Sequence, residues 1–241
     1  MSPLSAKVKK LMKLRCGMVV VAAGSSVRMG YDKLTLPLCG TPVLARTLLS
    51  LNECACVEEI VLVTREDRLA EMAELCRQHG ITKLKSIVCG GKSRTESALA
   101  GLLALSENVK YALIHDGARP LVTEDVVEKV LNCAMAHRNA CPAVPLTDTV
   151  KHRDGDKVLD TPDRASLCAV QTPQGFLADL VKTALTKAVG EGKEYSDDCA
   201  AVEALGVPTY LAEGSRENIK ITTPLDIALA ELIIRQREEK A

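Results

Sequence analysis

The chain contains no tryptophan and a single phenylalanine, and its charges balance at 31 basic and 31 acidic residues. With so few aromatic side chains, it has little surface on which the bases of single-stranded nucleic acid could stack. A formal net charge of zero removes the bulk attraction to nucleic acid or to an anionic membrane. No apolar run in the sequence approaches the ~18 residues that a membrane span requires. We therefore expect neither a nucleic acid nor a membrane as a partner.

The ten cysteines include no Cys-x-x-Cys pair. Most of them lie in apolar segments, where a free thiol behaves as a small buried hydrophobe. This distribution favours structural thiols over a zinc site or a redox motif, and free thiols are typical of a reducing, cytoplasmic setting. The basic residues near the start precede an apolar run that is shorter than the ~7–15 residues of a signal-peptide core. We therefore expect residues 1–16 to form a basic, solvated N-terminal tail.

Short apolar segments alternate with helical patterns along the rest of the chain. At 241 residues and 47% hydrophobic content, the chain can bury a sizeable core. This alternation predicts one α/β domain over residues 17–241, with a mostly parallel sheet and helices on both faces. The predicted strands are the apolar run at 18–23 and the segments 59–64, 85–89, 111–115 and 208–212.

Helix signals separate these strands. Thr41-Pro42 predicts an N-cap followed by proline at the first helical position, and Thr123 before two acidic residues predicts a second cap. In the third predicted helix, we expect Leu99, Leu102 and Leu103 to share one apolar face. The predicted helices cover residues 42–51, 66–78, 93–105, 123–137, 177–190 and 197–205, and a last one begins at 224.

Residues 147–165 interrupt this alternation with a polar stretch. Its two halves flank Asp154-Gly155, a dipeptide that favours a tight hairpin turn. A two-stranded hairpin with little to bury is only marginally stable by itself. We therefore expect it to pack against the parent sheet or against a second subunit, and a mobile surface loop is the alternative.

The most informative segment follows the first predicted strand. Ala22, Ala23 and Gly24 carry almost no side chain, so their backbone N–H groups can approach a triphosphate closely. Arg28 and Lys33 lie in the polar loop that comes next. Open α/β sheets bind ligands at the carboxyl ends of their strands. The segment therefore predicts a polyanion site that could stabilise charge developing during phosphoryl-type transfer.

Asp116 directly follows the strand at 111–115, so it is expected at the same edge of the sheet. Its carboxylate is a hard oxygen ligand that suits Mg²⁺. An aspartate before a glycine is also typical of an ordinary turn, which is the alternative interpretation.

Two familiar phosphate-binding loops do not fit this sequence. A dinucleotide-binding loop needs three glycines, and the segment from Gly24 to Gly30 lacks the middle one. A Walker A loop would end at Gly91-Lys92-Ser93, but Ser86 stands where its first glycine belongs. The site predicted here therefore binds phosphates in another way.

Six motifs follow one another along nearly the whole chain from about residue 17. They are AAGSSVRMGYDK at 22–33, GGKSR at 90–94 with Ser97, HDGARP at 115–120, PLTDTVK at 145–151, QTPQGF at 171–176 and ENIKIT at 217–222. In this order they resemble the 2-C-methyl-D-erythritol 4-phosphate cytidylyltransferases. The resemblance implies a Rossmann-like three-layer α/β/α nucleotidyltransferase fold with a protruding β-hairpin arm. It also implies a reaction of CTP with a sugar-alcohol phosphate in early isoprenoid biosynthesis, with release of pyrophosphate and Mg²⁺ as cofactor.

The resemblance also implies roles at the nucleotide. Ala22, Ala23 and Gly24 match the backbone that holds the CTP phosphates. Arg28 and Lys33 match the pair that stabilises the transition state as the substrate phosphate attacks the α-phosphorus. Fixed cations can do so by positioning two polyanions and neutralising their charge. The other nucleotide positions are Gly91 and Ser97 beside the cytosine and ribose, and Asp116, which is also the expected Mg²⁺ ligand.

A second group matches the residues that hold the erythritol phosphate. Thr149 and Arg164, which belong to it, flank the hairpin at 147–165. In this family the hairpin reaches across a homodimer, so each site would be completed by its neighbour. His115 is interpreted as a structural hydrogen-bonding residue rather than a general base, because a phosphate monoester is already ionised. The whole group is Arg119, Thr149, Arg164, Thr172 and Lys220.

Other functions stay open at this point. A cytidylyltransferase for another polyol phosphate, such as D-ribitol 5-phosphate, would share the nucleotide-binding motifs and differ only in a few side chains of the second group. A non-catalytic regulator would bind CTP without releasing pyrophosphate. The joint presence of Arg28, Lys33, Asp116 and Lys220 argues against a regulator. The missing glycine disfavours a dinucleotide oxidoreductase.

Overall fold

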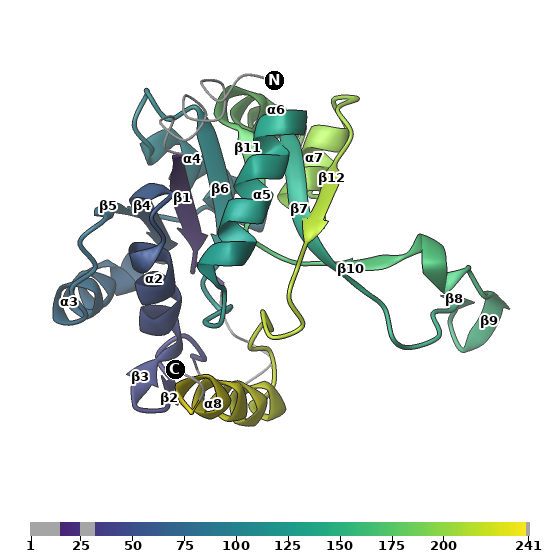
Figure 1. The fold of residues 1–241 in the computed structure, drawn as a ribbon. Helices are drawn as coiled ribbons and strands as arrows, with labels where there is room; N and C mark the ends of the chain where they lie inside the picture. Colours follow the sequence, from purple (N-terminus) through teal and green to yellow (C-terminus); the bar gives the residue numbers. More distant parts are fainter. Residues whose placement is uncertain (1–14, 25–31, 240–241) are drawn as a thin grey trace, which may run out of the picture.

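Eight strands form one mixed sheet at the centre of the molecule (Figure 1). The structure is a computed structural model that describes residues 15–24 and 32–239. The strands are β1 (Cys16–Val21), β4 (Val57–Thr64), β5 (Leu84–Cys89), β6 (Tyr111–Asp116), β7 (Asn139–Pro145), β10 (Cys168–Val170), β11 (Gln174–Leu177) and β12 (Tyr210–Glu213). Their order across the sheet is β10-β7-β11-β6-β1-β4-β5, and β12 also pairs with β7.

Strands β6, β1, β4 and β5 run parallel to one another, which confirms the strands predicted from the apolar segments. They are nearly continuous apolar runs because both faces are covered. In β1, Met18 and Val20 enter the core on one face and Val19 enters the core on the other. The register sets Val21 of β1 opposite Asp116 of β6. The loops that leave these two strands therefore begin side by side at one edge of the sheet.

The other half of the sheet is mostly antiparallel. β11 runs antiparallel to β6 and β7, and β10 runs antiparallel to β7. β12 is parallel to β7 and confirms the strand predicted at 208–212. The sequence patterns do not predict β7, β10 or β11. β7 contains Pro142 and Pro145, which weaken a strand prediction, and β10 and β11 are only 3 and 4 residues long.

Helices lie on both faces of the sheet and give the molecule three layers (Figure 1). They are α2 (Val43–Glu53), α3 (Leu69–Gln78) after the 3-10 turn η2 (Glu66–Arg68), α4 (Arg94–Ala104), α5 (Glu124–His137), α6 (Ala178–Gly190), α7 (Asp198–Glu203) and α8 (Pro224–Glu238). Side chains of α2, α3 and α5 build the core on one face, and those of α4, α6 and α7 build the core on the other. Among the helices that the structure describes, none is both long and apolar enough to cross a membrane.

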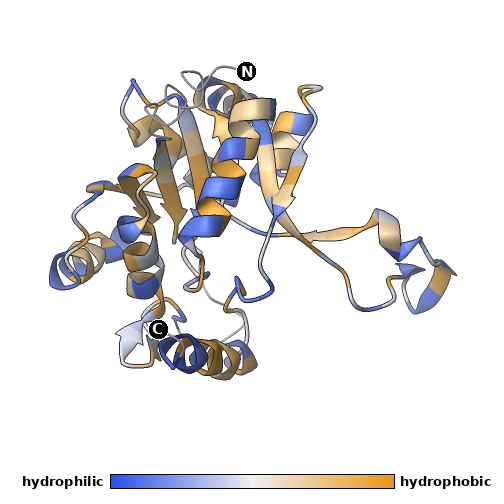
Figure 2. Ribbon diagram, viewed as in Figure 1, coloured by the Kyte–Doolittle hydropathy of each residue, from blue (hydrophilic) through white to orange (hydrophobic). Residues whose placement is uncertain are grey.

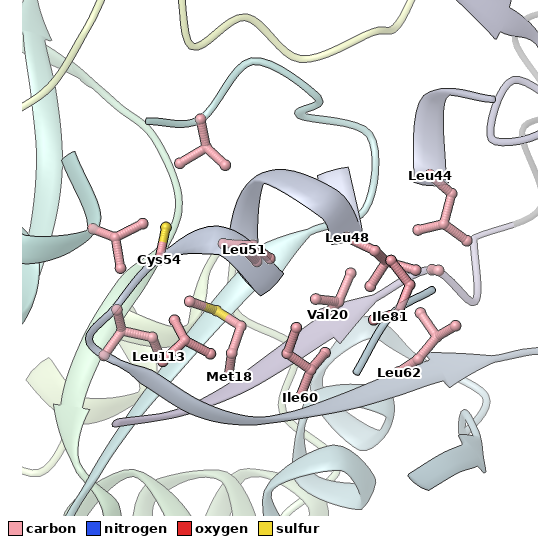
Figure 3. Close-up of a cluster of buried hydrophobic side chains, with 14 of the residues drawn as sticks. Met18, Val20, Leu44, Leu48, Leu51, Cys54, Ile60, Leu62, Ile81 and Leu113 are labelled. Carbon is pink, nitrogen blue, oxygen red and sulfur yellow. The ribbon is translucent and has the colours of Figure 1, made fainter. Parts of the chain in front are cut away.

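The first of these cores is closely packed around β1, β4 and α2 (Figure 3). Met18, Leu48, Leu51 and Ile60 are all fully buried in it. Figure 2 shows the strands of the central sheet largely in hydrophobic colours, while hydrophilic residues lie on the helices that cover them. All ten cysteines are free, and six are buried, among them Cys54 in this core.

Three details of the helix predictions are wrong. Thr41-Pro42 forms the short strand β3, which pairs with β2 (Pro37–Leu38), so α2 begins only at Val43. Thr123 stands at the N-cap position of α5, but its side chain accepts no capping hydrogen bond. Leu103 is 65% exposed, because neighbouring helical residues are turned about 100° apart and the buried stripe of α4 runs through Leu102.

The hairpin prediction for residues 147–165 is confirmed. Strands β8 (His152–Asp154) and β9 (Lys157–Asp160) form their own two-stranded sheet, which projects from the body of the molecule between β7 and β10 (Figure 1). Gly155 has a φ of +53°, a conformation that glycine adopts without strain. Every residue of both strands is exposed. In the described part of the chain this arm does not pair with the parent sheet, so packing against a second subunit stays a prediction.

Candidate active site

A cleft of about 540 Å³ opens beyond the ends of β1 and β6. Segments far apart in the sequence line it: the loop after β1, the loop before α4, the turn after β6 and the segment before α8. Lys220, one of the residues predicted to hold the substrate phosphate, also lines the cleft. Arg28 falls outside the described residues. The predicted nucleotide residues that line the cleft are Ala22, Ala23, Gly24, Lys33, Gly91, Ser97 and Asp116.

The turn after β6 packs directly against the loop after β1. The N–H of Gly117 donates to the carbonyl of Val21 over 3.0 Å. A Cβ atom on Gly117 would lie 3.2 Å from that oxygen and 3.3 Å from the Cβ of Ala22. A side chain here would crowd the loop, so glycine is the residue that allows this approach. Small residues thus bring the two strand ends together at the wall of the cleft.

Asp116 places a carboxylate in the cleft, and three cationic side chains surround it. Its Oδ2 lies 2.8 Å from Nζ of Lys220 and 3.6 Å from Nε of Arg119. Its Oδ1 lies 3.8 Å from Nη2 of Arg94. Burial alone would raise the pKa of Asp116, but the three cations, Lys220 foremost, lower it to about 2. The carboxylate is therefore ionised at neutral pH.

Arg94 is a cleft residue to which the sequence analysis assigns no role. It is the first residue of α4, and its guanidinium forms a bidentate ion pair with Asp198, the first residue of α7, at 2.9 and 2.8 Å. Desolvation acts to lower the pKa of Arg94, but the neighbouring carboxylates, Asp198 foremost, outweigh it, so the pKa is raised and the guanidinium stays protonated. The two residues are 104 positions apart, so no local sequence pattern joins them.

Ser97 orders the glycine loop at the edge of the cleft. Its hydroxyl accepts a hydrogen bond from the N–H of Gly91 at 3.1 Å and donates to the carbonyl of Ser93 at 2.9 Å. Ser93 caps α4 by accepting from the N–H of Glu96, and the carboxylate of Glu96 accepts from the N–H of Lys92. The side chains of Ser97 and Glu96 therefore both hold the backbone of the loop at Gly91 and Lys92. Contact between Ser97 and a base stays a prediction.

Arg119 and Thr172, both predicted to hold the substrate phosphate, lie next to Asp116 but are not among the described residues that line the cleft. Asn218, which the sequence analysis does not single out, connects them. Its carbonyl accepts from Nη1 of Arg119 at 2.7 Å, and its Nδ2 donates to the carbonyl of Thr172 at 2.8 Å. Asn218 is fully buried. Asn218 lies two residues before the cleft-lining Lys220, and its contacts with Arg119 and Thr172 could not be recognised without the fold.

His115 is fully buried beside Asp116. Its Nδ1 lies 3.0 Å from Oγ1 of Thr172, and its Nε2 lies 3.3 Å from the carbonyl oxygen of Arg119. Burial lowers the pKa of His115 to about 4, so the ring is neutral at pH 7. The residue makes structural hydrogen bonds, as the sequence analysis predicts.

Thr149 and Arg164 are exposed residues at the base of the arm, and neither is among the described residues that line the cleft. Arg164 donates a hydrogen bond to the carbonyl of Thr147. It lines a second hollow, of about 620 Å³, between the arm and the strands β7, β10 and β12. Within one chain, the structure therefore does not bring these two residues to Asp116 and Lys220.

The donor set of the cleft fits a metal ion that arrives with its ligand. Within residues 15–24 and 32–239, no group of three or more His, Cys, Asp or Glu side chains is arranged to hold a metal. Asp116 supplies one ionised carboxylate. Mg²⁺ commonly takes one or two carboxylates and completes its shell with substrate phosphates and water. The residues present therefore fit Mg²⁺ bound together with a triphosphate, and not a metal enclosed by protein alone.

Comparisons with known proteins point to one family. The family model of the 2-C-methyl-D-erythritol 4-phosphate cytidylyltransferases matches residues 16–236. The chain is 42% identical over 224 residues to the enzyme of that name from Halalkalibacterium halodurans, covering 92% of this chain and 98% of the relative. The structure of the Thermus thermophilus enzyme is similar, with a TM-score of 0.75, 31% identity and coverage of 90% and 98%. A 4-diphosphocytidyl-2C-methyl-D-erythritol synthase from Anaerococcus prevotii has a TM-score of 0.82 and 29% identity, with 92% and 96% covered.

Proposed function

The chain belongs to the 2-C-methyl-D-erythritol 4-phosphate cytidylyltransferase family, and we propose that it brings CTP and the substrate phosphate together in the cleft beyond β1 and β6. As a member of this family it is a nucleotidyltransferase of isoprenoid biosynthesis. The family and the relatives are named for 2-C-methyl-D-erythritol 4-phosphate, and none of these names favours the D-ribitol 5-phosphate alternative. We take residues 17–241 as one domain after a basic tail. The ten free thiols support a reducing, cytoplasmic setting.

In the proposed reaction, an oxygen of the erythritol phosphate forms a bond to the α-phosphorus of CTP. The bond from this phosphorus to the oxygen that bridges to the β-phosphate breaks, and pyrophosphate leaves with that electron pair. Both reactants are polyanions, so their approach requires cations that are already in place. The observation that carries the proposal is the convergence of Lys33, Arg94 and Lys220 on one cleft at the strand ends.

Each part of the cleft then has a task in this reaction. The backbone amides of residues 22–24 are proposed to hold the triphosphate. Arg28 and Lys33 are proposed to act at the α-phosphorus, where negative charge increases in the transition state. Cations fixed before the reaction stabilise that charge without reorganising during it. Gly91 and Ser97 are proposed to lie beside the cytosine and ribose.

We propose Mg²⁺ as the cofactor, held by Asp116 together with phosphate oxygens of the nucleotide. The support is the chemistry of the donor, a carboxylate that is ionised at neutral pH inside the cleft. When bound, the ion would supply charge neutralisation and orientation of the triphosphate. Lys220, 2.8 Å from the same carboxylate, holds Asp116 in place and presents a further positive charge to the second substrate.

The erythritol phosphate is proposed to bind between the two protomers of a homodimer. Arg119 and Lys220 would come from one protomer, and Thr149 and Arg164 from the arm of its partner. Two observations support this arrangement. The arm projects from the body of the molecule (Figure 1). Its residues Thr149 and Arg164 are exposed, and neither is among the described residues that line the cleft of its own chain. It also exposes apolar side chains, with Val158 at 52% and Leu159 at 60%.

The release of pyrophosphate from CTP and a panel of polyol phosphates tests this function. We expect the fastest turnover with 2-C-methyl-D-erythritol 4-phosphate, and no release when the polyol phosphate is omitted. Faster turnover with D-ribitol 5-phosphate would overturn the substrate. CTP binding without pyrophosphate release from any member of the panel would indicate a regulator instead of an enzyme.

A further inference from the structure

We propose that Thr172 and His115 are positioning residues that fix Asp116 for the nucleotide, and that the hydroxyl of Thr172 does not bind the phosphate of the second substrate. The inference rests on the proposed function, because it concerns the site where CTP is proposed to bind. It departs from the role that the family resemblance implies for Thr172. What carries it is the direction of three hydrogen bonds.

These hydrogen bonds have one consistent direction. The carbonyl oxygen of Arg119 can only accept, so Nε2 of His115, at 3.3 Å, carries the ring proton. The imidazole is fully buried, and among the described residues its two nitrogens contact a carbonyl and a hydroxyl but no carboxylate, so a second ring proton would bury a charge that no anion contacts; Nδ1 therefore has no proton and accepts. Oγ1 of Thr172, 3.0 Å away, therefore donates its one proton to Nδ1. The same oxygen accepts the N–H of Asp116 over 3.1 Å.

The hydroxyl of Thr172 consequently has no proton left for a ligand. Its proton is engaged with His115, and one of its two lone pairs is engaged with Asp116. The oxygens of an ionised phosphate are acceptors only, so they cannot bond to the remaining lone pair. Thr172 is also 5% exposed, and its carbonyl is engaged with Nδ2 of Asn218. Both the hydroxyl and the carbonyl therefore serve contacts within the protein.

The bonds span the turn that presents Asp116 to the cleft. They begin at the N–H of Asp116 and end at the carbonyl of Arg119, and the N–H of Arg119 donates to the carbonyl of Asp116 at 3.1 Å. Without the hydroxyl, the N–H of Asp116 and Nδ1 of His115 would be buried without their partner, which is unfavourable enough to shift the turn. Such a shift would move the Asp116 carboxylate away from its place beside Lys220.

The test is the affinity for CTP alone, measured by calorimetry with Mg²⁺ present and the second substrate absent. Thr172→Val keeps the shape of the side chain but removes the hydroxyl, and we expect the Kd for CTP to rise about tenfold, the size of one lost hydrogen bond. Thr172→Ser keeps the hydroxyl and should restore the affinity. Thr209→Val is the matched control, since Thr209 also accepts one hydrogen bond and donates one, between Asn139 and Glu203. It should leave the affinity unchanged.

A folded Thr172→Val protein that binds CTP like the wild type and loses affinity only for the second substrate would overturn the proposal. Adding His115→Leu to Thr172→Val should weaken CTP binding no further, because both residues act in one chain of bonds, and additive losses would contradict this.

A second readout needs no ligand. The ring ¹⁵N signals of His115 should show a proton on Nε2 and none on Nδ1, and the reverse would contradict the direction of the bonds. If the wild type binds no CTP, the proposed function fails, and these signals still decide between the two directions.

Discussion

At the scale of single residues, the cleft holds the carboxylate of Asp116 among three cationic side chains, of which Arg94 is also paired with Asp198. Asp116 is ionised although it is buried, because Lys220, Arg94 and Arg119 together outweigh the effect of burial on its pKa. The three cations outnumber the two carboxylates that they contact, Asp116 and Asp198. The field of the cleft therefore favours the approach of two phosphorylated reactants to each other, which is unfavourable in water. Lys33 adds a further cationic side chain at the wall of the same cleft.

The first prediction concerns Lys33 and turnover. Lys33→Ala should lower kcat by about 10²–10³-fold and change the Kd for CTP much less, because a charge that acts on the transition state affects turnover more than binding. Pyrophosphate release measures kcat and calorimetry measures Kd. Lys92 lines the same cleft and is the matched control, so Lys92→Ala should retain turnover. Equal losses of kcat and affinity in Lys33→Ala would show that this lysine only binds the ground state.

The second prediction concerns His115 and pH. Burial lowers the pKa of His115 from 6.5 to about 4 in the folded protein, so the unfolded state takes up the proton first as the pH falls. The contribution to stability is complete above pH ~6.5 and is lost towards pH ~4, by up to about 3 kcal/mol. Urea unfolding at a series of pH values measures it. His115→Leu lacks the titrating group and should lose less stability over this range. The same loss in both proteins would contradict the prediction.

At the scale of elements, the parallel half of the fold follows from local patterns. Strands buried on both faces are continuous apolar runs, and the helices between them carry periodic apolar stripes. The strand β7 does not follow from its local pattern, because its two prolines disfavour a strand. Its pairing with β10, β11 and β12 stabilises it nevertheless, and these partners lie far away in the sequence. The site divides in the same way. Asp116 is predictable because it directly follows a predicted strand, whereas the Arg94–Asp198 pair exists only once α4 and α7 have packed.

The third prediction concerns the start of α8. One carboxylate oxygen of Asp226 accepts the N–H groups of Thr222 and Thr223 at 2.8 and 2.7 Å, and it completes a capping box with Thr223. Asp226→Ala should lower the free energy of unfolding in urea by about 1 kcal/mol. Asp179→Ala removes an acidic residue from the first turn of α6 and should lower it less. Equal losses for the two variants would argue against the capping role.

At the scale of the whole molecule, the proposed site is shared between body and arm. The body supplies the cleft with Lys33, Asp116 and Lys220. The arm carries Thr149 and Arg164 on a two-stranded sheet that is separate from the central sheet. Hairpins of this size are marginally stable alone. A second copy of the chain that covers the arm would both stabilise it and complete the phosphate-binding group.

The fourth prediction concerns the arm and the dimer. Replacing the exposed Val158 and Leu159 together by Asp should weaken dimerisation in sedimentation velocity and raise the KM for the polyol phosphate, because two charges would enter an apolar contact. The Kd for CTP should stay unchanged, since its cleft belongs to the body. Leu103→Asp is the matched control, because Leu103 is equally exposed on α4, far from the arm in sequence. A dimer that persists unchanged would contradict the role of the arm.

The account depends most on where the nucleotide binds, and a crystal structure with CTP and Mg²⁺ tests this directly. We predict the triphosphate against the backbone of residues 22–24, within reach of Lys33, and the metal on Asp116. Density for the nucleotide in any other part of the molecule, with this cleft free of phosphate, would contradict it.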